Sequence, residues 1–264
     1  MSRVAMLIDE SICMACRGCQ VACKQWNDLP AEQTTQRGTY ENPPDRSAIT
    51  WQLVRFREYV QGENLQWLFL TEGCFHCGTP ACVAVCPTSA LKQDPDLGIV
   101  TVESDLCNGC GYCTQFCPFD IPRRDADVLT GLGKAFKCHM CQDRVTNGLI
   151  PACVKTCPAG ALDFGDRNEM LAKGKDRVEY LKQAGFPNAN LYGEQEMGGL
   201  GRLYVLKERP SAYGLPEDPQ YPVLEPVWQN VVQPLGTLAF GAAALGVLAF
   251  WAIARRNINM EEVE

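Results

Sequence analysis

The chain reads Cys107-Asn-Gly-Cys110-Gly-Tyr-Cys113-Thr-Gln-Phe-Cys117-Pro118 near its middle, with four cysteines in a short stretch. Three further groups of four cysteines surround it, and together the groups use all 16 cysteines of the 264-residue chain. Each group opens with C-x-x-C and closes with C-x-x-x-C, so one motif occurs four times. In chain order the groups are Cys13, Cys16, Cys19 and Cys23; Cys74, Cys77, Cys82 and Cys86; Cys107, Cys110, Cys113 and Cys117; and Cys138, Cys141, Cys153 and Cys157.

The spacing within the groups indicates what the cysteines bind. Groups one and three have the C-x2-C-x2-C-x3-C spacing of the bacterial [4Fe–4S] ferredoxin run. Groups two and four differ only in a longer middle gap, by two and nine residues. Proline follows the last cysteine in three groups, at Pro87, Pro118 and Pro158, whereas Lys24 stands there in the first. The pattern predicts four [4Fe–4S] clusters, each held by four soft thiolate ligands.

Two other uses of cysteine fit this pattern less well. Disulfides suit small secreted frameworks, and cysteines this close together in sequence are poorly placed to bridge one another. A zinc-binding structural protein needs four ligands per site, often as two separated C-x-x-C pairs. Zinc stays a remote alternative, and iron and sulfide analysis separates it from the iron–sulfur interpretation.

Composition excludes other classes of function. The net charge is −7, the pI is about 5.0 and no basic run occurs, so nothing indicates a nucleic-acid surface. The sequence offers no convincing nucleophile, acid–base pair or substrate pocket, and we assign no catalytic residue. We therefore expect a non-catalytic electron-transfer subunit rather than an enzyme in its own right.

The order of the groups predicts how the chain is organised. Between groups two and three lie a short helical segment, a turn at 94–98 and an apolar run at 99–102, as in a small two-cluster ferredoxin. We expect residues 73–126 to form this inner unit. It would be inserted into an outer unit, residues 1–72 and 127–207, which carries groups one and four. The expected fold class is α+β: two nested dicluster ferredoxin-like units followed by a single C-terminal transmembrane helix.

Nesting also predicts which cysteines share a cluster. In ferredoxins with two clusters, the last cysteine of one run binds the other cluster. The expected ligand sets are Cys13, Cys16, Cys19 and Cys157 (cluster a); Cys138, Cys141, Cys153 and Cys23 (cluster b); Cys74, Cys77, Cys82 and Cys117 (cluster c); and Cys107, Cys110, Cys113 and Cys86 (cluster d).

Other side chains lie beside these ligands in sequence. The two histidines, His76 and His139, fall inside groups whose cysteine sets are already complete, so we expect packing and hydrogen-bonding roles. Four cationic residues neighbour ligating cysteines, and they either raise local reduction potentials or simply face solvent. They are Arg17, Lys24, Lys137 and Lys155.

Hydrophobic patterns predict the remaining elements. We expect a strand at 4–8, a polar connector at 25–50, a strand pair at 51–59 and 65–70, and a strand at 203–206. A helix is expected from Asp166 to Ala184, because Asp166 and Glu169 form a capping-box pattern and Gly185 follows the helix.

The C-terminal part predicts a membrane anchor. A proline-rich linker at 208–226 precedes a helix at 227–254, in which residues 235–254 carry no charge and span about 30 Å. Arg255 and Arg256 begin a tail, residues 255–264, that the positive-inside rule places in the cytoplasm and the cluster domain therefore in the periplasm. Residues 1–9 do not read as a signal peptide, so export would need a signal-bearing partner.

The chain resembles the four-cluster electron-transfer subunits of the molybdopterin oxidoreductase family. Finer matches resemble the iron–sulfur (beta) subunit of membrane-bound formate dehydrogenase. They are Cys16-Arg-Gly-Cys19-Gln-Val-Ala-Cys23-Lys-Gln-Trp26-Asn27-Asp28, Asn42-Pro-Pro-Asp45-Arg-Ser47-Ala48 and Pro151-Ala-Cys153-Val-Lys-Thr-Cys157-Pro158.

The resemblance implies partners at both ends of the cluster row. A catalytic subunit with a bis-pterin molybdenum or tungsten centre would oxidise formate, and a membrane cytochrome b would pass electrons to quinone. The resemblance also implies that the cluster of group one faces the catalytic subunit and that of group three faces the membrane. The same module in a polysulfide, thiosulfate or dimethyl sulfoxide reductase, or in a membrane hydrogenase, is the alternative.

Overall fold

The computed structural model describes residues 3–127, 129–222 and 224–257. The chain forms two compact units, Met1–Tyr221 and Pro222–Glu264, and each is described by itself. All 16 cysteines belong to the first unit.

A four-stranded sheet forms the framework of the first unit, in the order β8-β1-β10-β9. β1 pairs in parallel with β10 and antiparallel with β8, and β9 pairs antiparallel with β10. The predicted strands at 4–8 and 203–206 are thus confirmed, and they are neighbours. The strands are β1 (Val4–Asp9), β8 (Leu162–Asp166), β9 (Asn190–Tyr192) and β10 (Arg202–Leu206).

The two faces of β1 pack into different cores, because successive side chains of a strand point to opposite sides. Ala5 and Leu7 are buried in a core shared with α6 (Arg167–Gln183). Met6 and Ile8 are buried in a larger core on the other face. Four cysteines are buried in that larger core: Cys19, Cys74, Cys138 and Cys153.

Helix α6 begins and ends where the sequence predicts. The carboxylate of Asp166 accepts hydrogen bonds from the backbone N–H of Asn168 at 2.8 Å and of Glu169 at 3.3 Å, which caps the N-terminus. Gly185 follows the helix with φ of 98°. The helix buries Val178 and other apolar side chains against the sheet.

Three hairpins carry the other strands. The pairs β2–β3 and β4–β5 confirm predicted hairpins, but the polar β6–β7 pair was not predicted. The expected boundary between residues 126 and 127 falls inside that third hairpin. The strands are β2 (Leu53–Gln61), β3 (Asn64–Glu72), β4 (Leu91–Gln93), β5 (Val100–Val102), β6 (Arg123–Ala126) and β7 (Gly133–Phe136).

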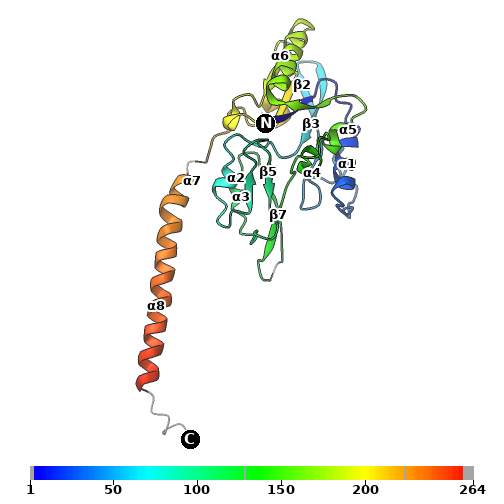
Figure 1. The fold of residues 1–264 in the computed structure, drawn as a ribbon. Helices are drawn as coiled ribbons and strands as arrows, with labels where there is room; N and C mark the ends of the chain where they lie inside the picture. Colours follow the sequence, from blue (N-terminus) through cyan, green and yellow to red (C-terminus); the bar gives the residue numbers. More distant parts are fainter. Residues whose placement is uncertain (1–2, 128, 223, 258–264) are drawn as a thin grey trace. The chain divides into compact units, whose positions relative to one another are not determined.

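Short helices follow the cysteine loops, and Figure 1 shows several of them close to the hairpins. The connector at 27–50 contains no helix or strand, and only an isolated bridge joins Ser47 to Thr50. The helices are α1 (Gly18–Trp26), α2 (Ala81–Ala84), α3 (Tyr112–Gln115), α4 (Gln142–Val145) and α5 (Ala152–Lys155).

The first unit extends further along the chain than the end of the cluster domain that the sequence predicts. A short 3₁₀ helix, Pro210–Tyr213, lies inside the expected linker, and Tyr213 at 1% exposure belongs to the main core. Leu215 is also buried there. Residues 208–215 therefore pack with the cluster domain.

The second unit is helical. It contains α7 (Leu224–Val227), a π-helical turn at Trp228–Val232 and the long helix α8 (Gln233–Asn257), visible in Figure 1. The segment Asn230–Arg256, with a mean hydropathy of 2.0, is long and apolar enough to cross a membrane. Of the expected tail, residues 255–257 continue the helix and residues 258–264 lie outside the described part.

Candidate metal centres

The four cysteine groups share one loop conformation. In every group the second residue after the first cysteine has a positive φ, a region that residues other than glycine rarely occupy. The φ values are 52° at Ala15, 48° at His76 and 53° at Met140. The fourth position is glycine, Gly109, with φ of 71°. Four different residues adopt the same backbone conformation at this position, so the groups share a loop structure as well as their cysteines.

The third cysteine of each group also has a common position. It is the second residue of a short helix in all four groups, which the sequence places after the cysteine loop. The four residues are Cys19 in α1, Cys82 in α2, Cys113 in α3 and Cys153 in α5. Loop and helix together therefore bring the cysteines of one group to the same side of the chain.

Three small cavities are lined by four cysteines each. Their volumes are about 20, 10 and 20 Å³. In each, three cysteines come from one group and the fourth is the last cysteine of another. The sets are Cys13, Cys16, Cys19 and Cys157; Cys138, Cys141, Cys153 and Cys23; and Cys74, Cys77, Cys82 and Cys117.

The remaining four cysteines also lie near one another. The charges of Cys110, Cys107 and Cys86 all act on Cys113, whose pKa is raised to about 11 mainly by burial. Cys113 packs with Cys86 and Cys107 against the β4–β5 and β6–β7 hairpins. The last cysteines of groups two and three thus each lie near the first three cysteines of the other group, as those of groups one and four do.

These donor sets fit an iron–sulfur cluster. Burial raises the pKa of Cys13 to about 12 and those of Cys19, Cys117 and Cys141 to about 11, because burial disfavours the thiolate form, which a bound metal would favour. Among the described residues, no three His, Cys, Asp or Glu side chains converge closely enough for a single metal ion. The sulfurs instead line small cavities in sets of four, which is the number of thiolate ligands that a [4Fe–4S] cluster takes.

Backbone N–H groups point at several of the sulfurs. Met140 donates to Cys138 Sγ at 3.3 Å, and Ala135 donates to Cys107 Sγ at 3.4 Å. Ile121 donates to Cys117 Sγ at 3.5 Å. Such bonds stabilise negative charge on sulfur, and they are one of the means by which a protein tunes cluster potential.

Both histidines have structural contacts. His76 is buried, and its Nδ1 accepts a hydrogen bond from the Val100 N–H at 3.0 Å. Burial, together with nearby Lys137, holds the pKa of His76 well below its usual value. His139 Nε2 lies 2.7 Å from Asn27 Oδ1. The neutral imidazole of His76 and the Asn27 contact of His139 agree with the expected hydrogen-bonding roles.

The cations that neighbour ligands divide into two kinds. Lys137 is buried, its Nζ donates to the carbonyls of Val100 and Cys138, and it lines the cavity of the group-two cysteines. Lys24 is tied to the connector, because its Nζ donates to the carbonyls of Pro30 and Ile49. Only Lys137 of this pair has a geometry suited to electrostatic tuning.

Two charged residues in the core were missed at the level of sequence. Glu10 accepts a hydrogen bond from the Thr71 N–H at 2.5 Å, and burial raises its pKa to about 8 beside Cys13. Arg202 is 0% exposed and its Nη2 lies 3.5 Å from Cys138 Sγ. The sequence signal for both was a charged residue at the end of an apolar strand. Glu10 directly follows β1, and Arg202 is the first residue of β10.

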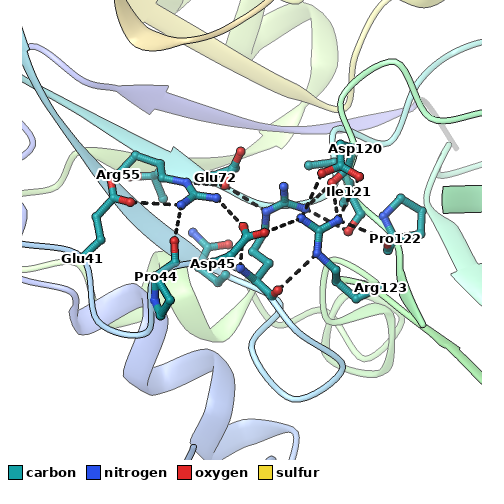
Figure 2. Close-up of polar contacts among 12 residues, drawn as sticks. Glu41, Pro44, Asp45, Arg55, Glu72, Asp120, Ile121, Pro122 and Arg123 are labelled. Carbon is teal, nitrogen blue, oxygen red and sulfur yellow. Dashed lines mark hydrogen bonds and ion pairs between the residues drawn. The ribbon is translucent and has the colours of Figure 1, made fainter. Parts of the chain in front are cut away.

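A network of arginines ties the connector to the end of group three (Figure 2). Arg46 donates to Glu72 Oε2 at 2.9 Å and to the carbonyls of Asp120 and Ile121 at 2.8 and 2.9 Å. Arg55 also binds Glu72, at 2.9 Å. Burial alone would lower the pKa of Arg55, but its carboxylate neighbours raise it above its usual value. The network fixes the backbone that follows Cys117.

Comparison with known proteins agrees with this site. Residues 65–167 match the family profile of the 4Fe-4S dicluster domain. The formate dehydrogenase iron-sulfur subunit of Haemophilus influenzae is 41% identical, over 99% of this chain and 83% of that protein. The nitrate-inducible formate dehydrogenase iron-sulfur subunit of Escherichia coli is 41% identical, over 94% of this chain and 84% of that protein.

A more distant relative is the hydrogenase-2 operon protein HybA of Escherichia coli, 33% identical over 74% of this chain and 67% of that protein. The near-complete coverage at about 41% identity, the dicluster profile and the four sets of cysteines agree with one another. The chain therefore belongs to the family of formate dehydrogenase iron-sulfur subunits, electron-transfer proteins that carry [4Fe–4S] clusters.

Proposed function

We propose that this chain relays electrons through four [4Fe–4S] clusters between a formate-oxidising catalytic subunit and a membrane cytochrome b. The catalytic subunit would hold a bis-pterin molybdenum or tungsten centre, and the cytochrome would reduce quinone. The observation that carries the proposal is the presence of four sets of four cysteines in one compact unit of a formate dehydrogenase relative.

The ligand sets proposed are the four that nesting predicts, clusters a to d. The three cavities lined by the cysteines of clusters a, b and c support those sets, and the mutual charges of Cys86, Cys107, Cys110 and Cys113 support cluster d. Exchange of the last cysteine between paired groups is the arrangement of two-cluster ferredoxins.

We infer the nested organisation from the same exchange. Residues 73–126 would form the inner unit, and residues 1–72 with 127–207 the outer one. Pairing of β1 with β8 joins the two ends of the outer unit, and pairing of β4 with β5 closes the inner one. The arginine network of Figure 2 would then join outer connector to inner unit.

Exposure of the cysteines supports an order for the four clusters. Cys16 of group one and Cys110 of group three are exposed, whereas every cysteine of groups two and four is buried or half-buried. Clusters a and d would therefore stand at the two ends of the electron-transfer chain, and clusters b and c would lie between them, shielded from solvent. We propose that cluster a faces the catalytic subunit and cluster d the membrane.

The chain contributes geometry and shielding to the reaction. A bound [4Fe–4S] cluster supplies a site for one electron at a time. The core residues around Cys19, Cys138 and Cys74 exclude water and hold three groups within one continuous apolar core. Hydrogen bonds from Met140, Ala135 and other N–H groups stabilise charge on the sulfurs. No residue of the chain needs to move a proton for this task.

The C-terminal helix is the proposed membrane anchor. At 1.5 Å per residue its 25 residues span about 37 Å, more than the hydrocarbon core of a bilayer. Arg255 and Arg256 lie in its last turn, so we propose that the C-terminus is cytoplasmic. The cluster domain would then be periplasmic and exported with a signal-bearing partner.

Isolation of the intact complex from membranes tests the function. We expect a large pterin-containing subunit and a cytochrome b to co-purify, and formate to reduce the iron–sulfur clusters. A large subunit that neither oxidises formate nor reduces carbon dioxide would contradict the formate assignment while leaving electron transfer in place. Bound zinc in place of iron would contradict electron transfer itself.

The relationship to HybA favours one second candidate, the same wire in a membrane hydrogenase. Its lower identity and coverage make it the less favoured of the two. Reduction of the clusters by hydrogen but not by formate in the isolated complex would select it.

A further inference from the structure

Arg202 places a positive charge inside the protein among the cysteines. It is the first residue of β10, pairs with Met6 of β1 and is 0% exposed. Its guanidinium lies against the backbone of Gly73, where an added Cβ would be 2.4–2.7 Å from guanidinium atoms. Gly73, the residue before Cys74, therefore leaves the space that this guanidinium occupies.

The guanidinium has few partners. Its Nη2 donates to Gln52 Oε1 at 2.7 Å and to Cys138 Sγ at 3.5 Å. Its Nε and Nη1 are buried and find no hydrogen-bond acceptor among the described residues. Within the same part of the chain, Arg202 forms no ion pair with a carboxylate, in contrast to Arg46 and Arg55.

A buried and unpaired cation is costly, and an arginine cannot relieve the cost by losing its proton. The sulfur site can supply negative charge beside this guanidinium, because its Nη2 lies 3.5 Å from Cys138 Sγ. By the same interaction, the guanidinium stabilises negative charge on a cluster that these sulfurs bind.

We propose that Arg202 raises the reduction potential of the cluster held by Cys138, Cys141, Cys153 and Cys23. An added electron makes a cluster more negative, and a fixed positive charge beside Cys138 stabilises that state in a poorly screened interior. The proposal rests on the proposed function, because it assumes that these cysteines bind a cluster. Arg202 acts through Cys138 and is a tuning residue, not a catalytic one.

Lys137 provides the internal comparison. It is a second buried cation beside a cysteine cavity, but it lines the cavity of Cys74, Cys77, Cys82 and Cys117. Its Nζ donates to two carbonyls instead of a sulfur. The two cations therefore belong to two different clusters, and their removal should shift two different steps of a redox titration.

The test is an EPR-monitored redox titration of the full chain in its complex, for wild type, Arg202→Gln, Arg202→Lys and Lys137→Gln. Arg202→Gln should lower one midpoint potential by at least about 59 mV, a tenfold change in a one-electron equilibrium. Arg202→Lys keeps the charge and should recover most of that shift. Lys137→Gln should lower a different midpoint. An unchanged set of midpoints in Arg202→Gln, or the same midpoint moved by both cations, contradicts the proposal.

Controls separate tuning from folding. Arg177→Gln removes an arginine that pairs with Asp9 on the outer side of the sheet and should leave all four midpoints in place. If the Arg202→Gln variant does not bind its clusters, Gln52→Glu is the second test. This change places a carboxylate against the guanidinium with little change of side-chain shape, and it should lower the same midpoint potential. No shift in Gln52→Glu would overturn the inference.

Iron and sulfide analysis of each variant separates this inference from the function on which it rests. A wild-type protein without iron would end the proposed function. Fully loaded variants with unchanged potentials would end only the role of Arg202.

Discussion

A residue with positive φ stands two positions after the first cysteine of every group, and in group three this residue is a glycine, Gly109. An added Cβ at Gly109 would lie 2.5–2.7 Å from backbone atoms of Gly133 on β7, which cannot move aside as a flexible side chain can. Ala15, His76 and Met140 adopt similar φ without that neighbour. The need for glycine therefore comes from packing against the hairpin, more than from the turn.

We predict that Gly109→Ala destabilises the protein by about 1–3 kcal/mol, the usual cost of forcing extra atoms into a packed site. Thermal unfolding followed by cluster absorbance measures it, and loss of the signal of one cluster should accompany the change. Gly131→Ala is the matched control, since Gly131 has φ of 67° on the same hairpin and its nearest neighbour is 3.9 Å away. Equal effects of the two substitutions would contradict the packing argument.

Exchange of the fourth ligand makes a sharper prediction at the same scale. If Cys23 and Cys141 bind one cluster, Cys23→Ser with Cys141→Ser should remove about four irons, no more than either change alone. Cys23→Ser with Cys16→Ser should remove about eight, because those residues then belong to two clusters. Iron and sulfide content of the purified protein decides. The reverse pattern of losses would mean that each group binds its own cluster.

The sequence identified all of these cysteines but not Arg202 or Glu10. Cysteine spacing is a local pattern, so it can be read along the chain. The role of Arg202 depends on contacts with Gln52 and Cys138, which are 150 and 64 residues away in the chain. No pattern local to the glycine-rich turn at 198–201 reveals those neighbours.

The connector shows the same limit at the scale of elements. Its composition predicts a polar connector at 25–50, of which residues 27–50 contain no helix or strand, but it does not predict that Arg46 is buried at 6% exposure. Arg46 joins the connector to β3 through Glu72 and to the loop after Cys117 through two carbonyls. In contrast, α6 was predicted almost to the residue, because its cap at Asp166 and its stop at Gly185 are local signals.

Arg46→Met should destabilise the first unit by about 3–5 kcal/mol, since it leaves buried partners without their hydrogen bonds. Glu72 would keep Arg55 and the Asp120 carbonyl would keep Arg123, but the Ile121 carbonyl would lose the Arg46 donor. We expect the cluster bound by Cys117 to be lost first on heating, as followed by absorbance and residual iron. Lys92→Met removes a pair with both side chains about half exposed and should have little effect. Similar losses in both variants would contradict the role of the network.

At the scale of the whole molecule, Cys16 of group one and Cys110 of group three are exposed, whereas the cysteines of groups two and four are buried or half-buried, and the proposed order of the clusters rests on this difference. The sequence predicted the row and its pairing because spacing alone carries them. The two ends of the row were implied only by the family resemblance, because the exposure of each cysteine depends on how hairpins and connector cover its loop. The apolar C-terminal segment was likewise evident from composition. Which side of this helix contacts a partner helix is inferred from the positions of its small residues.

That face gives the last prediction. Ala239, Ala242, Ala243 and Gly246 recur at three- and four-residue intervals, so they share one side of α8 and allow close approach of another membrane helix. Gly246→Leu should weaken association with the cytochrome b subunit about tenfold, because overpacking a close contact costs about 1–3 kcal/mol. Gly241→Leu adds the same side chain on the opposite side of the helix and should leave the complex intact. Both variants should still partition into the membrane, since each gains apolar surface. The ratio of cytochrome to iron–sulfur subunit after detergent extraction measures the effect, and equal dissociation in the two variants would show that this face does not make the contact.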